Sequence, residues 1–366
     1  MGKDRFAARR DRLHRKLSAA GVDALLVSSA VNVRYLTGFT GEDSFLLTGP
    51  RATVLISDGR FATQIAEECP DLDVHIRGLR QTILDATGRV VRRAGLKKLA
   101  FESDATSYAQ WEKLSEIVKS VERVPLSGVV EELRMVKDAD EIGQIREAIV
   151  QAERGFEVLR ASITSDMTER EASHRLEQAM RQFGARGASF ESIIAVGPRS
   201  ALPHARPTTR PVGGAGFVLV DWGAANFQGY SSDLTRVLVT GKISPKLERV
   251  YRVVLTAQRR GIEAIRPGVR GCDVDAAARK VIANAGWGQK FRHSLGHGIG
   301  LEIHEGPRLA KTSEIPLRPG MVVTVEPGVY FPGWGGVRIE DDVLVTRNGF
   351  EVLTSVSQDL EQMVVG

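Results

Sequence analysis

Short apolar runs alternate with helix-compatible segments over about the first 130 residues. Five runs have the length and apolar character of buried strands: residues 24–27, 45–47, 53–56, 74–76 and 99–101. Polar stretches with helical character separate them, for example at residues 107–118. Strands that alternate with helices are typical of a sheet covered by helices, so this part of the chain predicts an α/β domain.

From residue 142 onward, apolar residues recur at the spacing of an amphipathic helix. The residues that recur at steps of three and four are Ile142, Ile145, Ile149, Ala152, Phe156 and Leu159. They share one helix face. Thr168 and Glu171 then form a capping box that begins a second helix, which should end near Gly184. Strand-like runs follow at residues 189–196, 217–222 and 230–239.

The same order of elements then repeats. Ser244 and Pro245 open a helix that should run to about residue 265, and Asp273 can cap another that ends at Gly286. Strand-like runs return at residues 321–330 and 337–346. Two rounds of a helix pair followed by strands predict an α+β domain with pseudo-symmetric halves. We place the domain boundary near residues 131–137, which gives one domain at 1–131 and a second at 132–366.

The composition is that of a packed globular protein. Hydrophobic residues make up 42% of the chain and charged residues 26%. Part of the net charge of +5 lies in a basic N-terminal stretch, which we interpret as a surface helix because no nucleic-acid-binding motif accompanies it. No apolar run reaches the ~18 residues of a membrane helix, and no signal-peptide core is present, so neither a membrane nor a nucleic acid is expected as a partner. Two cysteines without a CxxC motif favour a reducing compartment, and hence the cytoplasm.

Two aspartates lie on strand-like runs that can form a hairpin. Asp221 and Asp233 are twelve positions apart, with a turn expected at residues 226–228, so they would face each other near the middle of the hairpin. Two opposed carboxylates repel each other and raise a pKa unless a divalent cation lies between them. The alternative is a structural pair held by Thr235 or Arg236, and the pattern alone leaves both interpretations open.

Two glutamates follow in later apolar runs. Glu326 comes after three valines within the preceding four residues, and buried glutamates are rare unless they are paired or metal-bound. Arg338 and Glu340 are two positions apart, so on a strand they share a face. A structural ion pair between these two residues is the alternative to a functional role.

Three of the seven histidines lie within twelve residues. His293, His297 and His304 stand among glycines that allow the backbone to approach a ligand and that argue against a helix. Ser294 occupies the position where a helical HExxH zinc motif needs glutamate, so that kind of site is excluded. The cluster indicates functional histidines. By contrast, His204 lies in a polar, proline-rich loop and by itself fits a surface histidine.

The candidate ligands form one oxygen-rich set, made of Asp221, Asp233, His297, Glu326 and Glu340. Four carboxylates and one imidazole favour Mn²⁺, Fe²⁺ or Co²⁺ in bridged pairs, with Zn²⁺ as a further option, over a single structural zinc. Two ions ~3.5–4 Å apart can share a hydroxide and activate it for attack. The residues therefore predict a paired metal site.

The motifs around these residues resemble those of the Xaa-Pro peptidases, the aminopeptidase P and prolidase group of pita-bread metallopeptidases. Five motifs occur in the family's order: Asp221-Trp222-Gly223, Ser232-Asp233-Leu234-Thr235-Arg236, His297-Gly298-Ile299-Gly300, Glu326-Pro327-Gly328 and Arg338-Ile339-Glu340-Asp341. Residues 35–41 resemble the creatinase-like domain that precedes the catalytic one, and residues 134–137 resemble the junction. The resemblance covers nearly the whole chain. It implies a creatinase/prolidase-like N-terminal domain and a pita-bread catalytic domain.

The resemblance also implies a role for each ligand. Asp221 and Asp233 would hold one metal ion, with Asp233 shared, and His297 would bind the second. Glu326 would bind the second ion and act as general base, while Glu340 would bridge both ions.

Four further residues correspond to supporting positions of the family. His204, His293 and His304 would handle substrate and protons, and Arg338 would support the site near the second aspartate. The family usually places its two aspartates eleven positions apart, whereas this chain has twelve. We expect the extra residue in the turn at 226–228, because within an arm of the hairpin it would turn an aspartate away.

The implied reaction is hydrolysis of the bond between an N-terminal residue and a following proline by a metal-activated hydroxide, with Mn²⁺ as the first choice of metal. The favoured activity is that of an Xaa-Pro aminopeptidase. The alternative is an Xaa-Pro dipeptidase, or prolidase, which needs a cation for the free carboxylate; Arg199, Arg206 and Arg338 are candidates. A non-catalytic binding module is the alternative of another class, against which the intact ligand set argues. Small proline-containing peptides are the expected partners, and the resemblance implies a homodimer.

Overall fold

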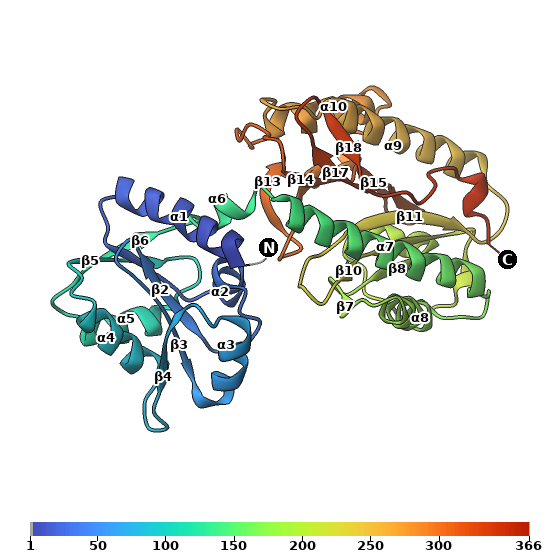
Figure 1. Ribbon diagram of the computed structural model, residues 1–366. Coiled ribbons are helices and arrows are strands. Elements are labelled where there is room, and N and C mark those ends of the chain that lie inside the picture. Colours follow the sequence, from blue (N-terminus) through green and yellow to red (C-terminus); the bar gives the residue numbers. More distant parts are fainter. Residues whose placement is uncertain (1–2, 366) are drawn as a thin grey trace. The chain divides into compact units, whose positions relative to one another are not determined.

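A computed structural model describes residues 3–365 of the chain, which form two compact units that meet in sequence at residue 134 (Figure 1). The first unit contains one mixed sheet with strand order β4-β3-β2-β1-β5-β6. Its strands are β1 (Ala24–Val27), β2 (Phe45–Gly49), β3 (Ala52–Asp58), β4 (Asp73–Arg77), β5 (Lys98–Glu102) and β6 (Glu122–Leu126). Strand β1 is parallel to β5 and antiparallel to β2.

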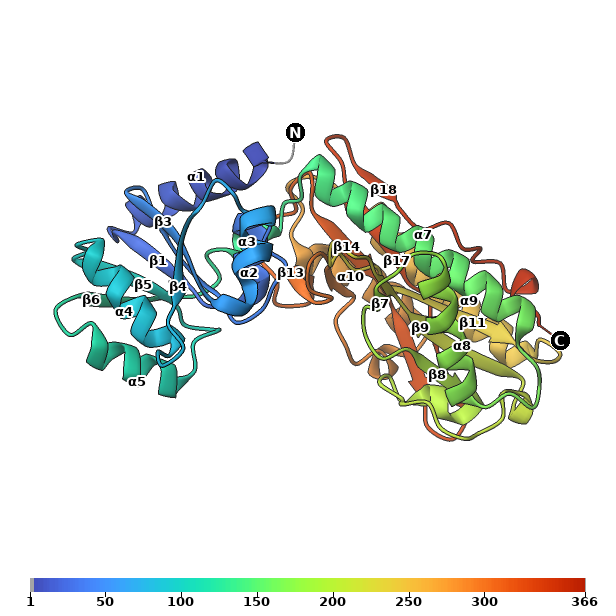
Figure 2. The same cartoon turned by 60° about the horizontal axis from the view of Figure 1, so that its bottom comes forward.

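Helices cover both faces of this sheet, with α1 and α2 on one side and α4 and α5 on the other (Figure 2). The helices are α1 (Lys3–Ala19), α2 (Ala30–Thr37), α3 (Ala62–Glu68), α4 (Ile83–Arg93), α5 (Tyr108–Ile117) and α6 (Glu131–Arg134). Consecutive residues of the central strands, such as Leu25 and Leu26, are both buried, as expected for a sheet with two covered faces. The predicted α/β architecture is confirmed. Strand β6 escaped prediction because this edge strand has no apolar run.

The second unit repeats one arrangement twice. Its first half comprises α7 (Ala139–Ser162), α8 (Glu169–Gln182), β7 (Gly187–Ala188), β8 (Ile193–Val196), β9 (Phe217–Trp222), β10 (Ala224–Ala225) and β11 (Leu234–Val239). Its second half comprises α9 (Pro245–Glu263), α10 (Gly271–Asn284), β12 (Gly296–Gly298), β13 (Glu305–Leu309), β14 (Val322–Val325), β15 (Gly328–Phe331), β16 (Gly335–Arg338), β17 (Asp341–Val345) and β18 (Phe350–Val352). Each half packs a helix pair against antiparallel strands, which confirms the pseudo-symmetric α+β fold.

Local signals explain where the helices of this unit begin. The Thr168 side chain accepts a hydrogen bond from Glu171 N in a complete capping box, and Ser244 caps α9 in front of Pro245. Helix α10 begins earlier than predicted, at Gly271, so Asp273 lies in its first turn instead of capping it. Among residues 3–365, no helix is both long and apolar enough to cross a membrane.

The two long strands predicted near the C-terminus are each broken at an acidic residue. Strand β14 ends directly before Glu326, and β15 resumes two residues later. Pro327 explains this break, because it has no N–H to donate and restricts the residue before it. The second break leaves Glu340 between β16 and β17, where it forms an isolated bridge with Thr235. The breaks therefore put acidic side chains at strand ends, where the two halves meet.

Trp222 links the strands of the first half to helix α7. Its ring stacks on Phe156 with the centroids 4.2 Å apart, and its Nε1 donates to the Ala152 carbonyl at 3.0 Å. Both aromatic side chains are fully buried. This contact fixes strand β9, which carries Asp221 as its penultimate residue, against helix α7.

We expect Trp222→Ala to destabilise the second unit by about 3–5 kcal/mol, because it leaves a large cavity between β9 and α7. Trp222→Phe should cost less, since it keeps the stacked ring and loses only the donor and part of the volume. Urea unfolding followed by circular dichroism measures both variants. Equal losses in the two variants would contradict the importance given to the stacked ring.

Candidate metal centre

The hairpin of β9 and β11 carries the two aspartates on the same face but not opposite each other. Asp221 pairs with Thr235, and Asp233 lies two residues before Thr235, so the two carboxylates are diagonal neighbours. The expectation that they face each other at the middle of the hairpin is wrong, because the turn is centred on residue 228, one position later than a turn at 226–228 implies. Both side chains are nonetheless buried, at 7% and 5% exposure.

The two arms of this hairpin keep one register up to the turn. The register that pairs Trp222 with Leu234 continues without a shift to a bridge between Ala225 and Ser231. The chain then reverses between Asn226 and Tyr230, where Asn226 N donates to the Tyr230 carbonyl at 3.0 Å. Neither arm contains a bulge that would turn one of its aspartates to the other face.

The second half contributes the other three candidate ligands from three neighbouring strands. His297 is the middle residue of β12, Glu326 follows β14, and Glu340 precedes β17. Strand β14 pairs with both β12 and β17, which brings these residues together. Glu340 N donates to the Thr235 carbonyl at 3.2 Å, and this contact joins the second half to the aspartate hairpin.

Three of the candidates have the spacing of a metal site. Asp233, His297 and Glu340 each offer a ligand atom, and these atoms all lie within 4.8 Å of one another. His297 Nε2 lies 3.6 Å from Asp233 Oδ2 and 3.5 Å from Glu326 Oε1. Such distances are long for hydrogen bonds and leave room for a cation between nitrogen and oxygen.

The backbone determines which nitrogen of His297 can bind a metal. Its Nδ1 lies 3.1 Å from the Gly298 carbonyl, an acceptor, so Nδ1 carries the proton. The lone pair is therefore on Nε2, the atom that faces Asp233 and Glu326. Burial lowers the pKa of His297 to about 4, which keeps the ring neutral and able to coordinate.

Asp221 has one oxygen engaged and one available. Its Oδ2 accepts a hydrogen bond from Arg338 Nη2, whereas its buried Oδ1 has no hydrogen-bond partner among the described residues. Buried oxygens normally have a partner, and a bound cation would supply one here. Together with the Nε2 lone pair of His297, this oxygen indicates that the residues fit a divalent ion.

Burial raises the pKa of all four candidate carboxyl groups. Burial and the Glu340 charge raise the pKa of Asp233 well above its usual value, and burial and Glu326 do the same to Glu340. Burial raises the pKa of Glu326 to about 8 and also raises that of Asp221, although Arg338 opposes both shifts. Crowded carboxylates of this kind ionise together only when positive charge is added, which is what a pair of divalent cations supplies.

Arg338 organises one side of the site. Its guanidinium binds Asp221, donates to Thr235 Oγ1 at 3.1 Å and donates to Tyr330 Oη at 2.8 Å. Thr235 in turn donates to Glu340 Oε2 at 2.6 Å. The arginine therefore supports one aspartate directly and the glutamate through a hydroxyl group, and no direct Arg338–Glu340 ion pair is recorded among the described residues.

His293 ends the same chain of hydrogen bonds. Its Nδ1 lies 2.8 Å from the Ser294 carbonyl and its Nε2 lies 2.9 Å from Tyr330 Oη. Nδ1 must therefore carry the proton, and Tyr330 donates to Nε2 while accepting from Arg338. The sequence analysis missed Tyr330; its place two residues after Gly328 in the Glu-Pro-Gly segment was the available signal.

The two remaining histidines lie at the exposed edge of the site. The His304 ring contacts the His297 ring edge to face, with the centroids 4.4 Å apart. His204 is exposed, and the positive charge of its protonated form would lower the pKa of Asp221 and of His304. Neither side chain makes a hydrogen bond among the described residues, so both are available to a ligand.

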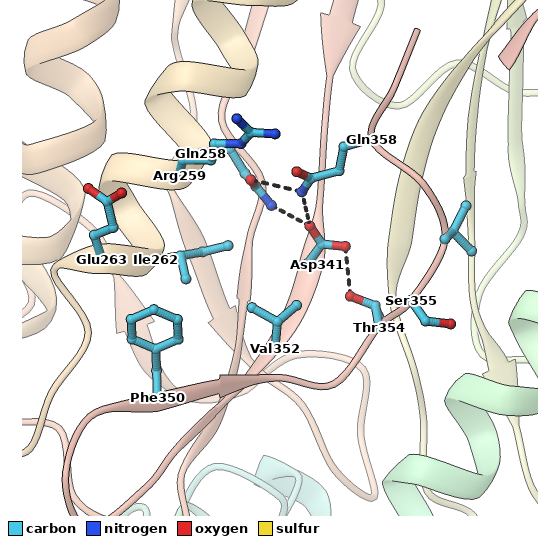
Figure 3. A pocket seen from close by; sticks show the side chains of 11 residues that line it. Gln258, Arg259, Ile262, Glu263, Asp341, Phe350, Val352, Thr354, Ser355 and Gln358 are labelled. Carbon is cyan, nitrogen blue, oxygen red and sulfur yellow. Dashed lines mark hydrogen bonds between the residues drawn. The ribbon is translucent and has the colours of Figure 1, made fainter. Parts of the chain in front are cut away.

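Two further acids, which the sequence analysis did not select, hold the segments next to the candidate ligands in place. Asp341 accepts hydrogen bonds from Gln258, Gln358 and Thr354 (Figure 3) and also pairs with buried Arg236. These contacts fix the start of β17 directly after Glu340. The lining of the pocket in front of Asp341 includes none of the five candidate ligands.

Asp342 is the second of these acids. It accepts a hydrogen bond from Asp233 N at 3.1 Å, which holds the hairpin against β17. Its position two residues after Glu340 gave no signal beyond one more acid in an acidic run.

Known proteins match the chain along both units. The model of metallopeptidase family M24 matches residues 143–347, and that of the creatinase/prolidase N-terminal domain matches residues 9–136. A solved Xaa-Pro dipeptidase from Bacillus anthracis is 39% identical with a TM-score of 0.94, covering 98% of this chain and 100% of its own. An Xaa-Pro dipeptidase from Pyrococcus horikoshii is 36% identical over 93% of this chain and 94% of its own. A solved X-Pro aminopeptidase from Thermotoga maritima is 35% identical, with a TM-score of 0.88 and coverage of 98% and 99%.

The metal-free protein should lose stability as the pH rises from 6.5 to about 8. Folding raises the pKa of Glu326 from 4.5 to about 8, so in this range the folded state holds a proton that the unfolded state has released. The loss should approach ~1.4 kcal/mol per pH unit for this group. His297, whose pKa falls from 6.5 to about 4, adds its full stabilisation above pH 6.5 and does not offset the loss.

Thermal unfolding of chelator-treated protein across this pH range measures the effect. Added Mn²⁺ should remove or reverse the trend, because metal binding favours ionised carboxylates and releases their protons. A metal-free protein whose melting temperature does not change over this range would contradict the assignment of a protonated Glu326.

Proposed function

The chain belongs to metallopeptidase family M24, and from that premise we propose that it is a prolidase-type enzyme that hydrolyses Xaa-Pro dipeptides. The proposed metal ligands are Asp221, Asp233, His297, Glu326 and Glu340. We propose Mn²⁺ as the first candidate, with Co²⁺, Fe²⁺ or Zn²⁺ as alternatives, because the set is rich in carboxylate oxygen. The clustering of Asp233, His297 and Glu340 is the observation that carries this proposal.

The dipeptidase activity fits better than the aminopeptidase activity that the sequence analysis favoured. Two relatives at 39% and 36% identity are described as Xaa-Pro dipeptidases. The aminopeptidase remains the alternative, because a relative at 35% identity is described as an X-Pro aminopeptidase. Both reactions need the same metal centre. They differ in whether the carboxylate of the proline is free, as in a dipeptide, or joined to a further residue.

The three arginines first considered for that carboxylate are already engaged. Arg338 binds Asp221. Arg199 binds the buried Glu169 at 3.0 Å. Arg206 is 86% exposed and lies 3.6 Å from Glu191, a loose contact on the surface. None of them presents an unengaged guanidinium beside the candidate ligands.

Arg308 is a better candidate for the carboxylate. It lies on β13, is exposed, and makes no hydrogen bond or ion pair among the described residues. Burial and then the Arg308 charge lower the pKa of His304, and the same charge acts on His297. We therefore propose that this guanidinium receives the carboxylate of a short substrate.

The residues around the centre suggest how this chemistry would proceed. When bound, the metal ions would polarise the scissile carbonyl and activate water. Glu326, with 16% of its side chain exposed and its Oε1 3.5 Å from His297 Nε2, would take the proton of the attacking water and pass it to the proline nitrogen. His304 would donate to the carbonyl oxygen, His293 would orient the amide, and the proline ring would lie beside His204.

The deciding experiment is chromatographic analysis of Ala-Pro and Ala-Pro-Gly after incubation with Mn²⁺ and the protein. We expect release of alanine and proline from Ala-Pro. The tripeptide should be cleaved at least ~10-fold more slowly, because its free carboxylate lies on the glycine, one residue beyond the position that Arg308 would recognise. Asp233→Asn is the control and should lose both metal binding and cleavage. Faster cleavage of the tripeptide would establish the aminopeptidase alternative, and no metal-dependent cleavage of either peptide would overturn the proposal.

Removal of the Arg308 charge should weaken dipeptide binding selectively. We expect Arg308→Ala to raise the KM for Ala-Pro by about 10–100-fold, the range of a lost charge-assisted hydrogen bond, with a smaller effect on Ala-Pro-Gly. Steady-state kinetics on both peptides measures the difference. Arg318→Ala removes another exposed arginine of the same unit and should leave both KM values unchanged. Equal effects of Arg308→Ala on the two peptides would exclude a carboxylate contact.

A further inference from the structure

Lys137 and Glu305 form a buried ion pair that lies outside the metal centre. Lys137 Nζ is 3.1 Å from Glu305 Oε2, and the two side chains are 1% and 5% exposed. Burying opposite charges costs about as much as their attraction returns, so stability alone is a poor explanation for such a pair. Lys137 also belongs to the segment 134–137 that marks the domain junction in the sequence.

The backbone at Lys137 is fixed to the strand that leads to Glu326. Lys137 N donates to the Gly320 carbonyl at 2.9 Å, and Gly320 N donates to the Val345 carbonyl at 2.9 Å. Gly320 stands two residues before β14. The lysine is therefore held at both ends, its backbone by Gly320 and its ammonium group by Glu305.

At the other end of the pair, the Glu305 carboxylate fills the inside of the turn at residues 299–305. Its Oε1 accepts a hydrogen bond from Glu302 N at 3.1 Å. A Cβ added to Gly300 would come within 2.7 Å and 2.8 Å of the two carboxylate oxygens, so the turn closes tightly on this group. Glu305 also pairs with Gly298 across β12 and β13, next to His297.

A second contact links the junction to the same loop. The Met135 side chain packs on Gly306, where an added Cβ would lie 2.5 Å from Met135 Cε. Gly306 lies two positions after His304 and two before Arg308. Both residues proposed to meet substrate are therefore carried by a loop that contacts residues 135 and 137.

We propose that Lys137 is a positioning residue for the substrate side of the site. Through Glu305 it holds the turn at 299–305, and this turn sets the place of the His304 ring and the start of the strand that bears Arg308. The effect on substrate rests on the proposed function, whereas the effect on the turn stands independently of it.

The test uses Lys137→Met in the full-length protein, because methionine keeps an unbranched stem and removes the charge. We expect hydrogen exchange of the amides in residues 299–305 to accelerate at least ~10-fold. With Mn²⁺ present, kcat/KM for Ala-Pro should fall by about 10–100-fold. The Mn²⁺ affinity should stay within about threefold of the wild type, since within residues 3–365 the polar contacts of Lys137 are with Glu305 and Gly320 and not with a proposed metal ligand.

Two matched variants separate positioning from general damage. Lys137→Arg keeps the charge and should recover most of the protection from exchange. Arg146→Met removes the cation of a solvent-exposed ion pair with Glu351 in the same unit and should behave like the wild type in every assay. If Lys137→Met alone does not fold, the double variant Lys137→Met/Glu305→Gln removes both charges, and its exchange and kinetics replace those of the single variant.

The outcomes separate this proposal from the proposed function. Faster exchange confined to the turn, together with lower kcat/KM at unchanged Mn²⁺ affinity, supports the positioning role. Wild-type exchange in the turn, or a uniform loss of protection and metal affinity throughout the unit, overturns it. A wild-type protein that cleaves neither peptide refutes the proposed function, while the exchange result still decides the role of Lys137.

Discussion

The concentration of buried negative charge between the two halves of the second unit is the constraint on which the site depends. Asp221, Asp233 and Glu340 are all less than 10% exposed, and Glu326 lies beside them. Without compensation, such a cluster holds protons instead of charge. Among the described residues, Arg338 is the only arginine that donates a hydrogen bond to one of these four carboxylates, and one guanidinium cannot neutralise four carboxylates. The cluster therefore fits the divalent cations that a member of this metallopeptidase family is expected to bind.

The duplicated architecture explains how so many acids reach one place. Each half ends its strands at the shared face, and the residues at those ends are the proposed ligands. The Thr235–Glu340 bridge joins the halves and also serves the site, because the Thr235 hydroxyl accepts from Arg338 and donates to Glu340. The contact that pairs the strands of the two halves therefore also positions the proposed ligands. A shift of either half would separate those ligands from one another.

The sequence predicted the elements of this structure better than their contacts. Apolar periodicity located the helices and most strands, since burial on one or two faces leaves a local pattern. It placed Asp221 opposite Asp233, however, because the register of a hairpin depends on the residue at which the turn is centred, and the apolar pattern did not locate that residue. The contacts that Tyr330 makes, and the pairing of Lys137 with Glu305, left no local pattern, although Tyr330 and Lys137 lie beside or within segments that the resemblance marked. Their roles come from contacts between residues that are far apart in the sequence, for which a single sequence contains no direct signal.

The same distinction explains why the metal ligands do not decide the substrate. A dipeptidase and an aminopeptidase that cleave before proline need one metal chemistry, so the ligand motifs are compatible with both. The two kinds of substrate differ in whether the proline after the scissile bond carries a free carboxylate. A cation that is not engaged elsewhere can recognise that carboxylate. Arg338, which belongs to a metal-site motif, is occupied by Asp221, whereas Arg308 lies on the loop that packs against Lys137. Specificity in this architecture is therefore expected to change through the loop at residues 299–308, while the carboxylate cluster stays the same.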